Sequence, residues 1–369
     1  MVRGALAGAP REWALTVGGE GRESGKRRRS AVTVEELGAA DHDRWAEAVR
    51  TALGGSPYSL PGYLDALCAA TGGTFRIFAA IRGDEIVGGV AAYERSSPIG
   101  RFVAPRLLLY YNGIVLREYD TRYPSERTSR QLEAVDAIAA VLEQRGYGRL
   151  ELRSRSPFTD VRALQARGWS AQPSYSYVVA LGDLEAQWAR VEQNLRRLVE
   201  RARSQGIELD PDAGADGLYR LHHETHQRKG APLYLPKEQF LAFVGALRDK
   251  GLGRVYAARL ADGRVAAAQL VLLGHPVTHT VVAAADGDLQ HTGANPFLRW
   301  SVFEQLAAEG AVANDLTDAT LGPVARFKSQ FGGRLETSYV TQRLSTTQRL
   351  QLGAYRSFRR ARTIVRRGG

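Results

Sequence analysis

The stretch AVANDLTDATLGPVARFKSQFGGRLETSYV, from Ala311 to Val340, predicts a strand, a short helix and a second strand. Pro323 suits the first position of the helix, because proline lacks the N–H group that would have no partner there. Gly332 and Gly333 suit the left-handed residue that follows a last helical turn. Both ends of the helix are therefore marked in the sequence.

This helix carries an apolar face with one lysine beside it. Val324, Phe327 and Phe331 follow the i, i+3, i+7 spacing of a single helix face. A helix of two turns is marginal in isolation, so packing of this face must hold it in place. Lys328 projects about 100° around the helix from Phe327. The lysine is therefore carried on a fixed element that can aim its ammonium group.

Length and composition indicate a globular protein of two domains. The chain has 369 residues, 44% of them hydrophobic, and a single core rarely grows much beyond ~250 residues. Its longest apolar runs, such as VAAAQLVLL, are about half the ~20 residues of a membrane span, and no apolar signal sequence occupies the first 25 residues. The single cysteine, Cys68, excludes an internal disulfide and is expected in the core. We expect a cytoplasmic protein.

The net charge of +11 belongs to the two ends of the chain. Residues 1–30 contain seven Arg or Lys against three Glu, and residues 345–369 contain seven Arg and no acid. We expect a disordered N-terminal tail and a basic C-terminal helix or tail. Such tails either contact RNA, anionic lipid or a phosphorylated substrate, which allows a membrane-peripheral location, or only keep the protein in solution.

An internal repeat organises the rest of the chain. SPYSLPGYLDAL, from Ser56, parallels APLYLPKEQFLAFV, from Ala231, with two prolines and a leucine in register at an offset of 175 residues. FRIFAAIRGDEIVGGVAAY similarly parallels RVYAARLADGRVAAAQLVL, including a hairpin turn. A unit of about 170 residues is too long for a solenoid repeat and suits a duplicated α/β domain. We place the two domains at residues 31–182 and 183–344.

Each copy has the predicted order strand, two helices, a meander of three strands, helix, strand, short helix and strand. This order predicts an α/β fold with mixed, mostly antiparallel sheets flanked by helices on both faces. The strand, helix and strand that end each copy imply a right-handed crossover. Ligands tend to bind where such a sheet changes direction.

The order of hairpin, loop, helix, strand and FKSQFG resembles the GNAT acyltransferase fold in tandem. The second half is similar to the Fem-like branch, whose best-known members are peptidoglycan interpeptide-bridge aminoacyltransferases. Three segments carry the resemblance: HETHQRKG at 223–230, GANPFLRW at 293–300 and FKSQFG at 327–332. It implies an enzyme that positions an acyl donor and an amine and stabilises a tetrahedral oxyanion.

The loop GDLQHTGAN is the expected donor site. With Asn295 as N-cap and Pro296 at the first helical position, the free N–H groups and dipole of the next helix would form an anion site. The resemblance places the GNAT pattern Gln/Arg-x-x-Gly-x-Gly/Ala here; Gln290 and Gly293 match it, whereas Asn295, after Ala294, departs from it. This departure weakens the case for coenzyme A. An ordinary capped helix is the alternative.

The first copy lacks an equivalent donor loop. Its segment REYDTRYPSERTSRQ contains no glycine, so we infer that this copy shapes the acceptor cleft instead. The segment that corresponds to FKSQFG, RSPFTDVRALQARGWS, contains no lysine. One active half is therefore predicted, with Lys328 facing the loop from Gln290 to Asn295.

Candidate residues for the acceptor lie on two polar helices. The resemblance places Thr225 and Arg228 in a Thr-x-x-Arg signature associated with the acceptor's phosphates, which the guanidinium fork can bind. Arg196, in NLRRLVERAR, is a further candidate. Solvated surface charges are the alternative for both helices. His222 and His226 share a helix face, but no third ligand is evident, so we expect no metal.

Two residues of the opening stretch are the catalytic candidates. Lys328 can stabilise the tetrahedral oxyanion or the donor's terminal phosphate as a point charge. A surface lysine is the alternative. Asp315 can orient the amine or accept its proton, and the alternative is an acid that caps the next turn.

Three functions follow from this sequence. In the first, an aminoacyl group moves from aminoacyl-tRNA to an amine of a cell-wall precursor or a peptide-like acceptor. The second is acyl-CoA-dependent acylation of a sugar amine or metabolite, and the third is a non-catalytic module that binds RNA or membrane through the tails. We expect no tightly bound cofactor, because the acyl donor is a co-substrate.

Overall fold

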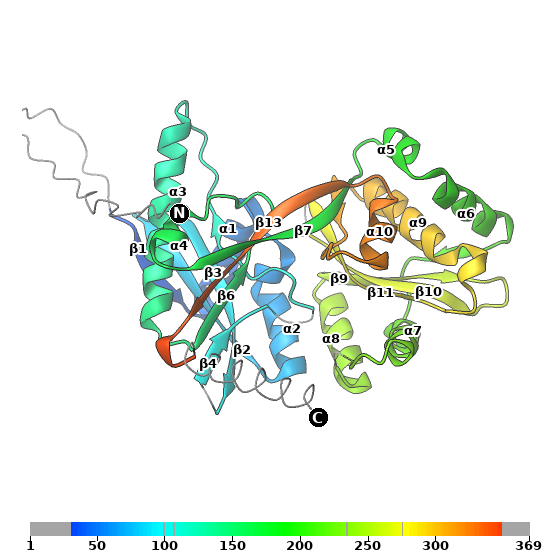
Figure 1. The fold of residues 1–369 in the computed structure, drawn as a ribbon, viewed down its shortest axis with the longest axis horizontal. Coiled ribbons are helices and arrows are strands. Elements are labelled where there is room, and N and C mark those ends of the chain that lie inside the picture. Colours follow the sequence, from blue (N-terminus) through cyan, green and yellow to red (C-terminus); the bar gives the residue numbers. More distant parts are fainter. Residues whose placement is uncertain (1–30, 99, 106–107, 234, 275, 349–369) are drawn as a thin grey trace, which may run out of the picture. The chain divides into compact units, whose positions relative to one another are not determined.

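The computed structural model describes residues 31–348, apart from positions 99, 106–107, 234 and 275 (Figure 1). The predicted N-terminal tail and most of the predicted C-terminal tail therefore lie outside the described residues. From Val32 onward the described chain forms one compact unit. No helix in this part of the chain combines the length and apolar character needed to cross a membrane.

One sheet runs through the described residues, in the strand order β1-β2-β3-β4-β6-β13-β7-β12-β11-β10-β9-β8, with β5 paired to β3. Only the pairs β4–β6 and β11–β12 are parallel, so the predicted mixed, mostly antiparallel sheet is confirmed. The strands are β1 (Thr33–Leu37), β2 (Thr74–Arg82), β3 (Glu85–Ser97), β4 (Gly100–Val103), β5 (Val115–Leu116), β6 (Arg149–Arg153), β7 (Ser170–Ala180), β8 (Glu208–Asp210), β9 (Gly253–Arg259), β10 (Val265–Leu272), β11 (Val277–Ala285), β12 (Ala313–Asp315) and β13 (Arg334–Leu344).

The helices follow the same order in the two halves, as the internal repeat predicts. Two helices precede each meander, one follows it, and a short helix precedes each last strand. The helices are α1 (His42–Thr51), α2 (Pro61–Thr71), α3 (Pro124–Gln144), α4 (Arg162–Ala166), α5 (Leu184–Arg190), α6 (Gln193–Ser204), α7 (Ala215–Arg228), α8 (Lys237–Asp249), α9 (Ala294–Ala308) and α10 (Pro323–Ser329).

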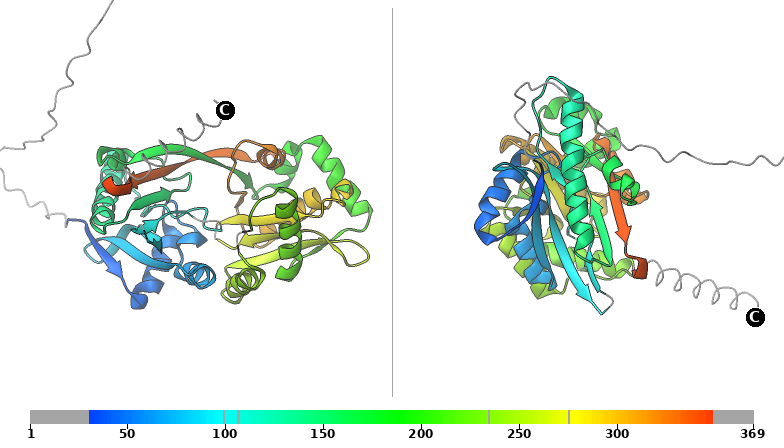
Figure 2. Two further views of the ribbon diagram at one scale, coloured as in Figure 1. Left: turned by 60° about the horizontal axis from the view of Figure 1, so that its bottom comes forward. Right: turned by 90° about the vertical axis from the view of Figure 1, so that its left-hand side faces the viewer.

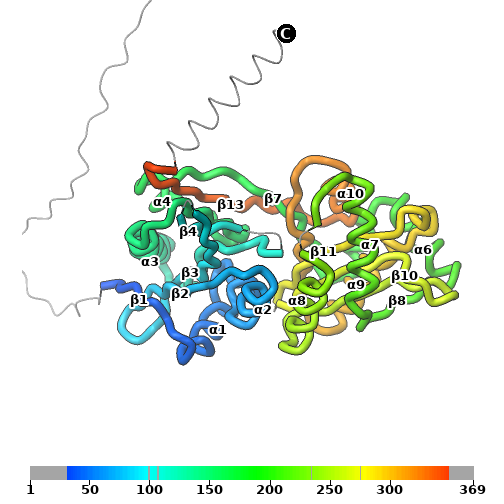
Figure 3. The backbone as a smooth tube through the Cα atoms, turned by 90° about the horizontal axis from the view of Figure 1, so that it is seen from below, coloured from blue at the N-terminus to red at the C-terminus, as the bar shows by residue number. Residues whose placement is uncertain are grey.

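The last strand of each half pairs with the other half. β7 lies against β12 of the second half, β13 lies against β6 of the first half, and β7 and β13 are paired to each other from Arg334↔Val178 to Gln342↔Ser170. Figure 3 shows these two strands side by side between the halves. This exchange makes one continuous sheet. The domain boundary near residue 182 stays a prediction.

Helices cover both faces of the sheet (Figure 2). On one face α1, α2, α7 and α8 enclose a core that is continuous across the two halves, where the rings of Tyr63 and Phe243 meet edge to face at 5.8 Å. On the other face α3 and α4 cover the first half, whereas α6, α9 and α10 cover the second. The middle of that second face, along β7 and β13, is the wall of a cavity described below.

Helix α10 begins with Pro323, as predicted, and Gly332 follows it in a left-handed conformation with φ of 71°. Phe331 is buried and meets the ring of Phe327 at 5.2 Å and that of Phe303, on α9, at 5.7 Å. The predicted place of Val324 on this buried face is wrong, because its side chain is 54% exposed. The aromatic residues therefore fix α10 by its C-terminal end.

Candidate active site

The candidate site lies where two parallel strands diverge. β11 pairs with β12 only as far as His279↔Asp315 and then continues to its end paired with β10 but not with β12. The chain after β12 instead follows β7, because the N–H groups of Leu316 and Ala319 donate to carbonyl groups of β7, both at 2.8 Å. A gap therefore opens in the sheet beyond Asp315. Thr317 crosses it once, donating its hydroxyl to the carbonyl of β11 residue Thr280 at 2.9 Å.

A cavity of about 420 Å³ occupies this gap, and we call it the lysine pocket. Lys328 and Arg299 reach it from α10 and α9, which pack on one face of the sheet. His222 and Thr225 reach it from α7, which packs on the other face. The pocket is thus accessible to side chains from both faces. The remaining polar or charged side chains that line it belong to Tyr110, His226, Lys229, Thr280, Thr317, Asp318 and Thr320.

Lys328 is held by a strained turn. Its Nζ donates to the carbonyl oxygens of Thr317 and Asp318 at 2.6 and 2.7 Å. These two residues have φ of 51° and 26°, a region that costs a non-glycine residue about 1–3 kcal/mol. A turn of ordinary conformation would aim the two carbonyls elsewhere. The strained backbone of Thr317 and Asp318 therefore aims the two carbonyl oxygens that hold the ammonium group of Lys328.

Burial and a neighbouring cation lower the pKa of Lys328 to about 8. Burial is the larger cause, and the charge of Arg299 adds to it, whereas Asp318 and Asp315 act in the opposite direction. At neutral pH the side chain remains mainly protonated. Lys328 therefore serves as a cation at pH 7 and becomes a neutral amine only above pH 8.

Asp315 is buried beneath the turn and does not line the lysine pocket. Its Oδ1 accepts from the N–H of Thr317 at 2.7 Å, and its Oδ2 accepts from the hydroxyl of Tyr111 at 2.8 Å. Burial raises the pKa of this carboxyl group, and the charge of Arg155 partly offsets the rise. The bond to Thr317 is the capping role named as the alternative, and the contact with Tyr111 ties the first half to the site.

His279 lies beside Asp315, with Nδ1 3.6 Å from Oδ2. Its side chain is fully buried, and burial holds its pKa well below the usual range, so the imidazole is neutral. The rings of Tyr58 and Tyr111 meet it at 5.3 and 5.9 Å. This aromatic layer supports the end of β12 from below.

The predicted donor loop has a different conformation from the one expected. α9 begins at Ala294 with left-handed Gly293 as its N-cap, so the assignment of Asn295 as N-cap and Pro296 at the first helical position is wrong. The N–H of Gly293 donates to the carbonyl of Gln290 at 3.4 Å, and that of Ala294 donates to the hydroxyl of Thr292 at 3.2 Å. Two amides that could hold a phosphate are therefore already engaged.

Helix α6 packs directly on this loop. A Cβ atom on residue 293 would lie 2.3 Å from the carbonyl oxygen of Leu198, and Arg201 donates to the carbonyl of His291 at 3.4 Å. The glycine thus permits close approach of two helices. A loop in this position has little room for a pyrophosphate between its backbone and α6.

The expected facing of Lys328 and residues 290–295 is not found. None of these six residues lines the lysine pocket, and the lysine lies beside Arg299, farther along α9. Lys328 does not point into open solvent either, because the Thr317–Asp318 turn holds its Nζ. Arg299 is the sixth residue of α9, so the lysine lies beside the N-terminal half of the helix that this loop precedes.

The structure places the three acceptor candidates in different surroundings. Thr225 lines the lysine pocket, and Arg228 donates to its hydroxyl at 3.3 Å while packing against Gly287. Arg228 itself does not line the pocket. Arg196 is half-buried on α6 and lines neither the lysine pocket nor the cavity described next. The structure therefore brings Thr225 to Lys328 and leaves Arg196 apart.

The histidines of α7 face the lysine pocket. The rings of His222 and His226 lie 4.3 Å apart, and burial, with the charges of His226 and Lys229, lowers the pKa of His222 to about 4. Within the described ranges no group of three His, Cys, Asp or Glu side chains is placed to hold a metal ion.

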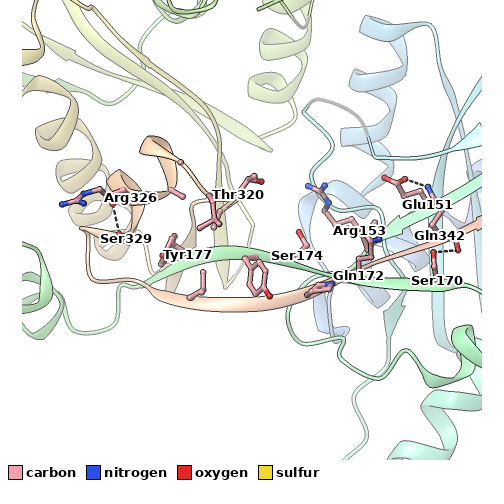
Figure 4. A pocket seen from close by; sticks show the side chains of 18 of the residues that line it. Glu151, Arg153, Ser170, Gln172, Ser174, Tyr177, Thr320, Arg326, Ser329 and Gln342 are labelled. Atoms are coloured by element: carbon pink, nitrogen blue, oxygen red, sulfur yellow. Dashed lines mark hydrogen bonds between the residues drawn. The ribbon is translucent and has the colours of Figure 1, made fainter. Parts of the chain in front are cut away.

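A second, larger cavity of about 1160 Å³ lies along β7 and β13, and we call it the ribbon pocket. Figure 4 shows Arg153 and Glu151 at one end and Thr320 and Arg326 at the other. Residues 320–322 and Ala325 line both this cavity and the lysine pocket. The loop before α10 therefore lies between two cavities.

Sequence reasoning missed Arg299 and the Thr317–Asp318 turn. Arg299 had a signal, because it is a charge inside the otherwise apolar run PFLRWSVF. The left-handed turn had none, since β-branched threonine seldom adopts such angles and aspartate does so only occasionally. Both features depend on the gap between β11 and β12.

Comparisons with known proteins find a matching domain family and solved structures of similar fold. Residues 189–329 match the acetyltransferase (GNAT) domain family. The fold is similar to the crystal structure of FemX, with 12% identity, a TM-score of 0.67, and coverage of 86% of this chain and 99% of that one. It is also similar to the C-terminal domain of a putative lysylphosphatidylglycerol synthetase from Agrobacterium fabrum, with 13% identity, a TM-score of 0.55, and coverage of 85% and 95%.

A tandem GNAT protein from the clavulanic acid biosynthesis pathway aligns at 12% identity with a TM-score of 0.49, over 84% of this chain and 97% of that one. No curated protein sequence matches the chain significantly. At such low identities the structures of FemX and of the synthetase domain establish a shared fold.

Proposed function

We propose that this chain, whose residues 189–329 match the acetyltransferase (GNAT) domain family and whose fold is similar to that of FemX, forms an amide by transferring an aminoacyl group from aminoacyl-tRNA. The acceptor is an amine of a cell-wall precursor or another peptide-like molecule. Such an enzyme needs an acyl donor and an amine acceptor that meet at one reacting carbon.

The contacts of Lys328 carry this proposal. Its ammonium group is largely buried, fixed by two carbonyls and protonated at neutral pH, so it is preorganised for a developing negative charge. When the amine attacks the ester carbonyl, that charge forms on the carbonyl oxygen. The N–C bond then forms, the ester C–O bond breaks, and the proton lost by the amine ends on the released ribose hydroxyl.

The state of the loop before α9 favours tRNA over coenzyme A as donor. A coenzyme A donor would need the backbone amides of this loop for its pyrophosphate. The amides of Gly293 and Ala294 have partners within the loop, and α6 packs on Gly293. An aminoacyl ester makes no such demand on this loop.

The two cavities suggest how two substrates reach one lysine. The loop before α10 lines both, and Lys328 opens into one of them. The ribbon pocket, at about 1160 Å³, exceeds the ~300–1,000 Å³ of typical small-molecule sites and suits a large substrate. In our proposal donor and acceptor approach this loop from opposite sides.

The test supplies charged tRNAs and acyl-CoAs separately with a panel of amines and follows acyl loss from each donor by mass spectrometry. We expect transfer from charged tRNA that stops after RNase treatment. Transfer that persists after RNase treatment and needs only acyl-CoA would show that acyl-CoA, and not aminoacyl-tRNA, is the donor. No transfer from either donor, with RNA binding that depends on residues 345–369, would favour the binding-module function.

A further inference from the structure

Within the residues that the structure describes, Arg299 is a buried cation without a bonded acid. Its side chain is 6% exposed and lines the lysine pocket from α9. Nη1 is inaccessible to water and has no hydrogen-bond partner in the described part of the chain. Burial lowers the pKa of this guanidinium group to about 10, a sign of its desolvation. An unpaired buried charge is costly, so its retention calls for a reason.

The acids near Arg299 are already engaged. Among the described residues, Asp318 is the only acid that lines the lysine pocket, and its Oδ1 accepts from the N–H and hydroxyl of Thr320 at 3.2 and 2.6 Å. Asp315 bonds to Thr317 and Tyr111. Neither carboxylate therefore neutralises the guanidinium group by direct contact.

The pocket as a whole is positive. Arg299 from α9, Lys328 from α10 and Lys229 from α7 line it, against the single carboxylate of Asp318. His222 and His226, on α7, also face it; burial is the main cause of the low pKa of His222, and the charges of His226 and Lys229 add to it. A cavity with this balance favours an anionic occupant.

We propose that Arg299 and Lys328 together bind one oxyanion of the substrate, a carboxylate or a phosphate, in the lysine pocket. The planar guanidinium group offers paired donors that match two oxygens of such a group, and the ammonium group adds a point charge. The side chain of Thr225 lines the same cavity and offers a hydroxyl group. Arg299 thereby sets which substrates are held long enough to react.

This inference rests on the proposed acyl transfer in one respect only: the proposed function determines which molecule carries the anion. A carboxylate would belong to a peptide-like acceptor, and a phosphate to the precursor or to the RNA donor. Anion binding itself can be measured without turnover. Failure of the acyl-transfer assay and failure of this inference are therefore distinguishable.

The first experiment titrates the full-length protein with inorganic phosphate and with acetate by calorimetry. We expect binding of at least one probe, weakened at least tenfold in Arg299→Gln and less in Arg299→Lys. Arg248→Gln, which alters an exposed arginine on α8, is the matched control and should bind as the parent does. The preferred probe identifies the class of anion.

The second experiment measures the pKa of Lys328 by NMR after reductive ¹³C-methylation, with Lys328→Met to assign its resonance among five lysines. Loss of a neighbouring positive charge in Arg299→Gln should raise the pKa above its value of about 8. Bound phosphate or acetate should raise it in the parent protein. If Arg299 and Lys328 did not bind anions, added phosphate or acetate would not raise the pKa of Lys328.

Two results would overturn the inference. One is unchanged phosphate and acetate affinity in a folded Arg299→Gln protein. The other is a Lys328 resonance that responds to neither anion at any pH between 7 and 10. If Arg299→Gln does not fold, the anion titration of the parent protein and of Arg299→Lys still decides, because it needs only folded protein.

Discussion

The two halves treat the same position in the sheet differently. In the first half, Asn112 closes the edge of β6 by donating from Nδ2 to the carbonyl of Glu151 at 2.9 Å and accepting at Oδ1 from the N–H of Arg153 at 2.8 Å. In the second half, the corresponding edge beyond Asp315 is open and holds the lysine pocket. The two halves have the same order of elements, but in the described chain only the first half has a residue, Asn112, that fills this position.

This difference supports the prediction of one active half. The sealed half has no lysine on α4, whereas the open half aims Lys328 from α10 into its gap. The first half still contributes Tyr110 to the pocket wall and Tyr111 to the support of Asp315. Its role is therefore structural at the site.

The largest effect is expected from Lys328→Met, which keeps the apolar stem and removes the ammonium group. Loss of one preorganised oxyanion donor costs roughly 10²–10³-fold in kcat. Single-turnover acyl transfer should slow by that factor, and KM should rise as well, because the same ammonium group also binds the substrate's anion. Lys250→Met, on an exposed lysine after α8, is the control. Normal turnover of Lys328→Met would contradict the proposed role of this lysine in stabilising the oxyanion.

Gly293→Ala tests whether the loop before α9 packs against α6 or binds coenzyme A. The left-handed φ of 80° and the 2.3 Å approach to the Leu198 carbonyl predict a loss of about 2–4 kcal/mol in the free energy of unfolding. Urea denaturation measures it. A variant of normal stability that had lost coenzyme A binding would show instead that this loop is a donor site.

Asn112→Ala should open the sealed half. It leaves a part-buried carbonyl and a part-buried N–H of β6 without their partners, at up to about 1–3 kcal/mol for each group lost. Chemical denaturation should show this destabilisation, while kcat measured well below the melting temperature changes less than threefold. A large fall in kcat at full stability would place chemistry in the first half.

The pH dependence of kcat tests whether Lys328 acts as a cation. Because the pKa of Lys328 is lowered from 10.5 to about 8, the ammonium form prevails below pH 8, and kcat should fall about tenfold per pH unit above it. The sign for stability is opposite: a depressed lysine pKa disfavours the folded cation, so this group's contribution to stability improves from pH 8 to 10.5. Lys328→Arg should remove the alkaline fall in kcat. A persistent fall would assign it to another group.

Local signals predicted the second half well. Pro323 marks the start of α10 and the glycines after Phe331 mark its end, because both residue types restrict or free the backbone in ways that need no tertiary contact. The same reasoning placed the N-cap of α9 two residues late, since a left-handed glycine and a threonine hydroxyl replaced the expected asparagine. Helix ends fixed by packing are harder to predict than helix ends fixed by proline.

The sequence by itself determined the repeated order of strands and helices and the lysine on a bounded helix, because periodicity, proline and glycine act within a few residues. Only the tertiary structure decided that β7 and β13 exchange partners, that the sheet opens beyond Asp315, and that Arg299 and Lys328 share the opening. These features arise from pairings between residues more than 100 positions apart. They are selected by the burial of the whole sheet, which no local pattern records.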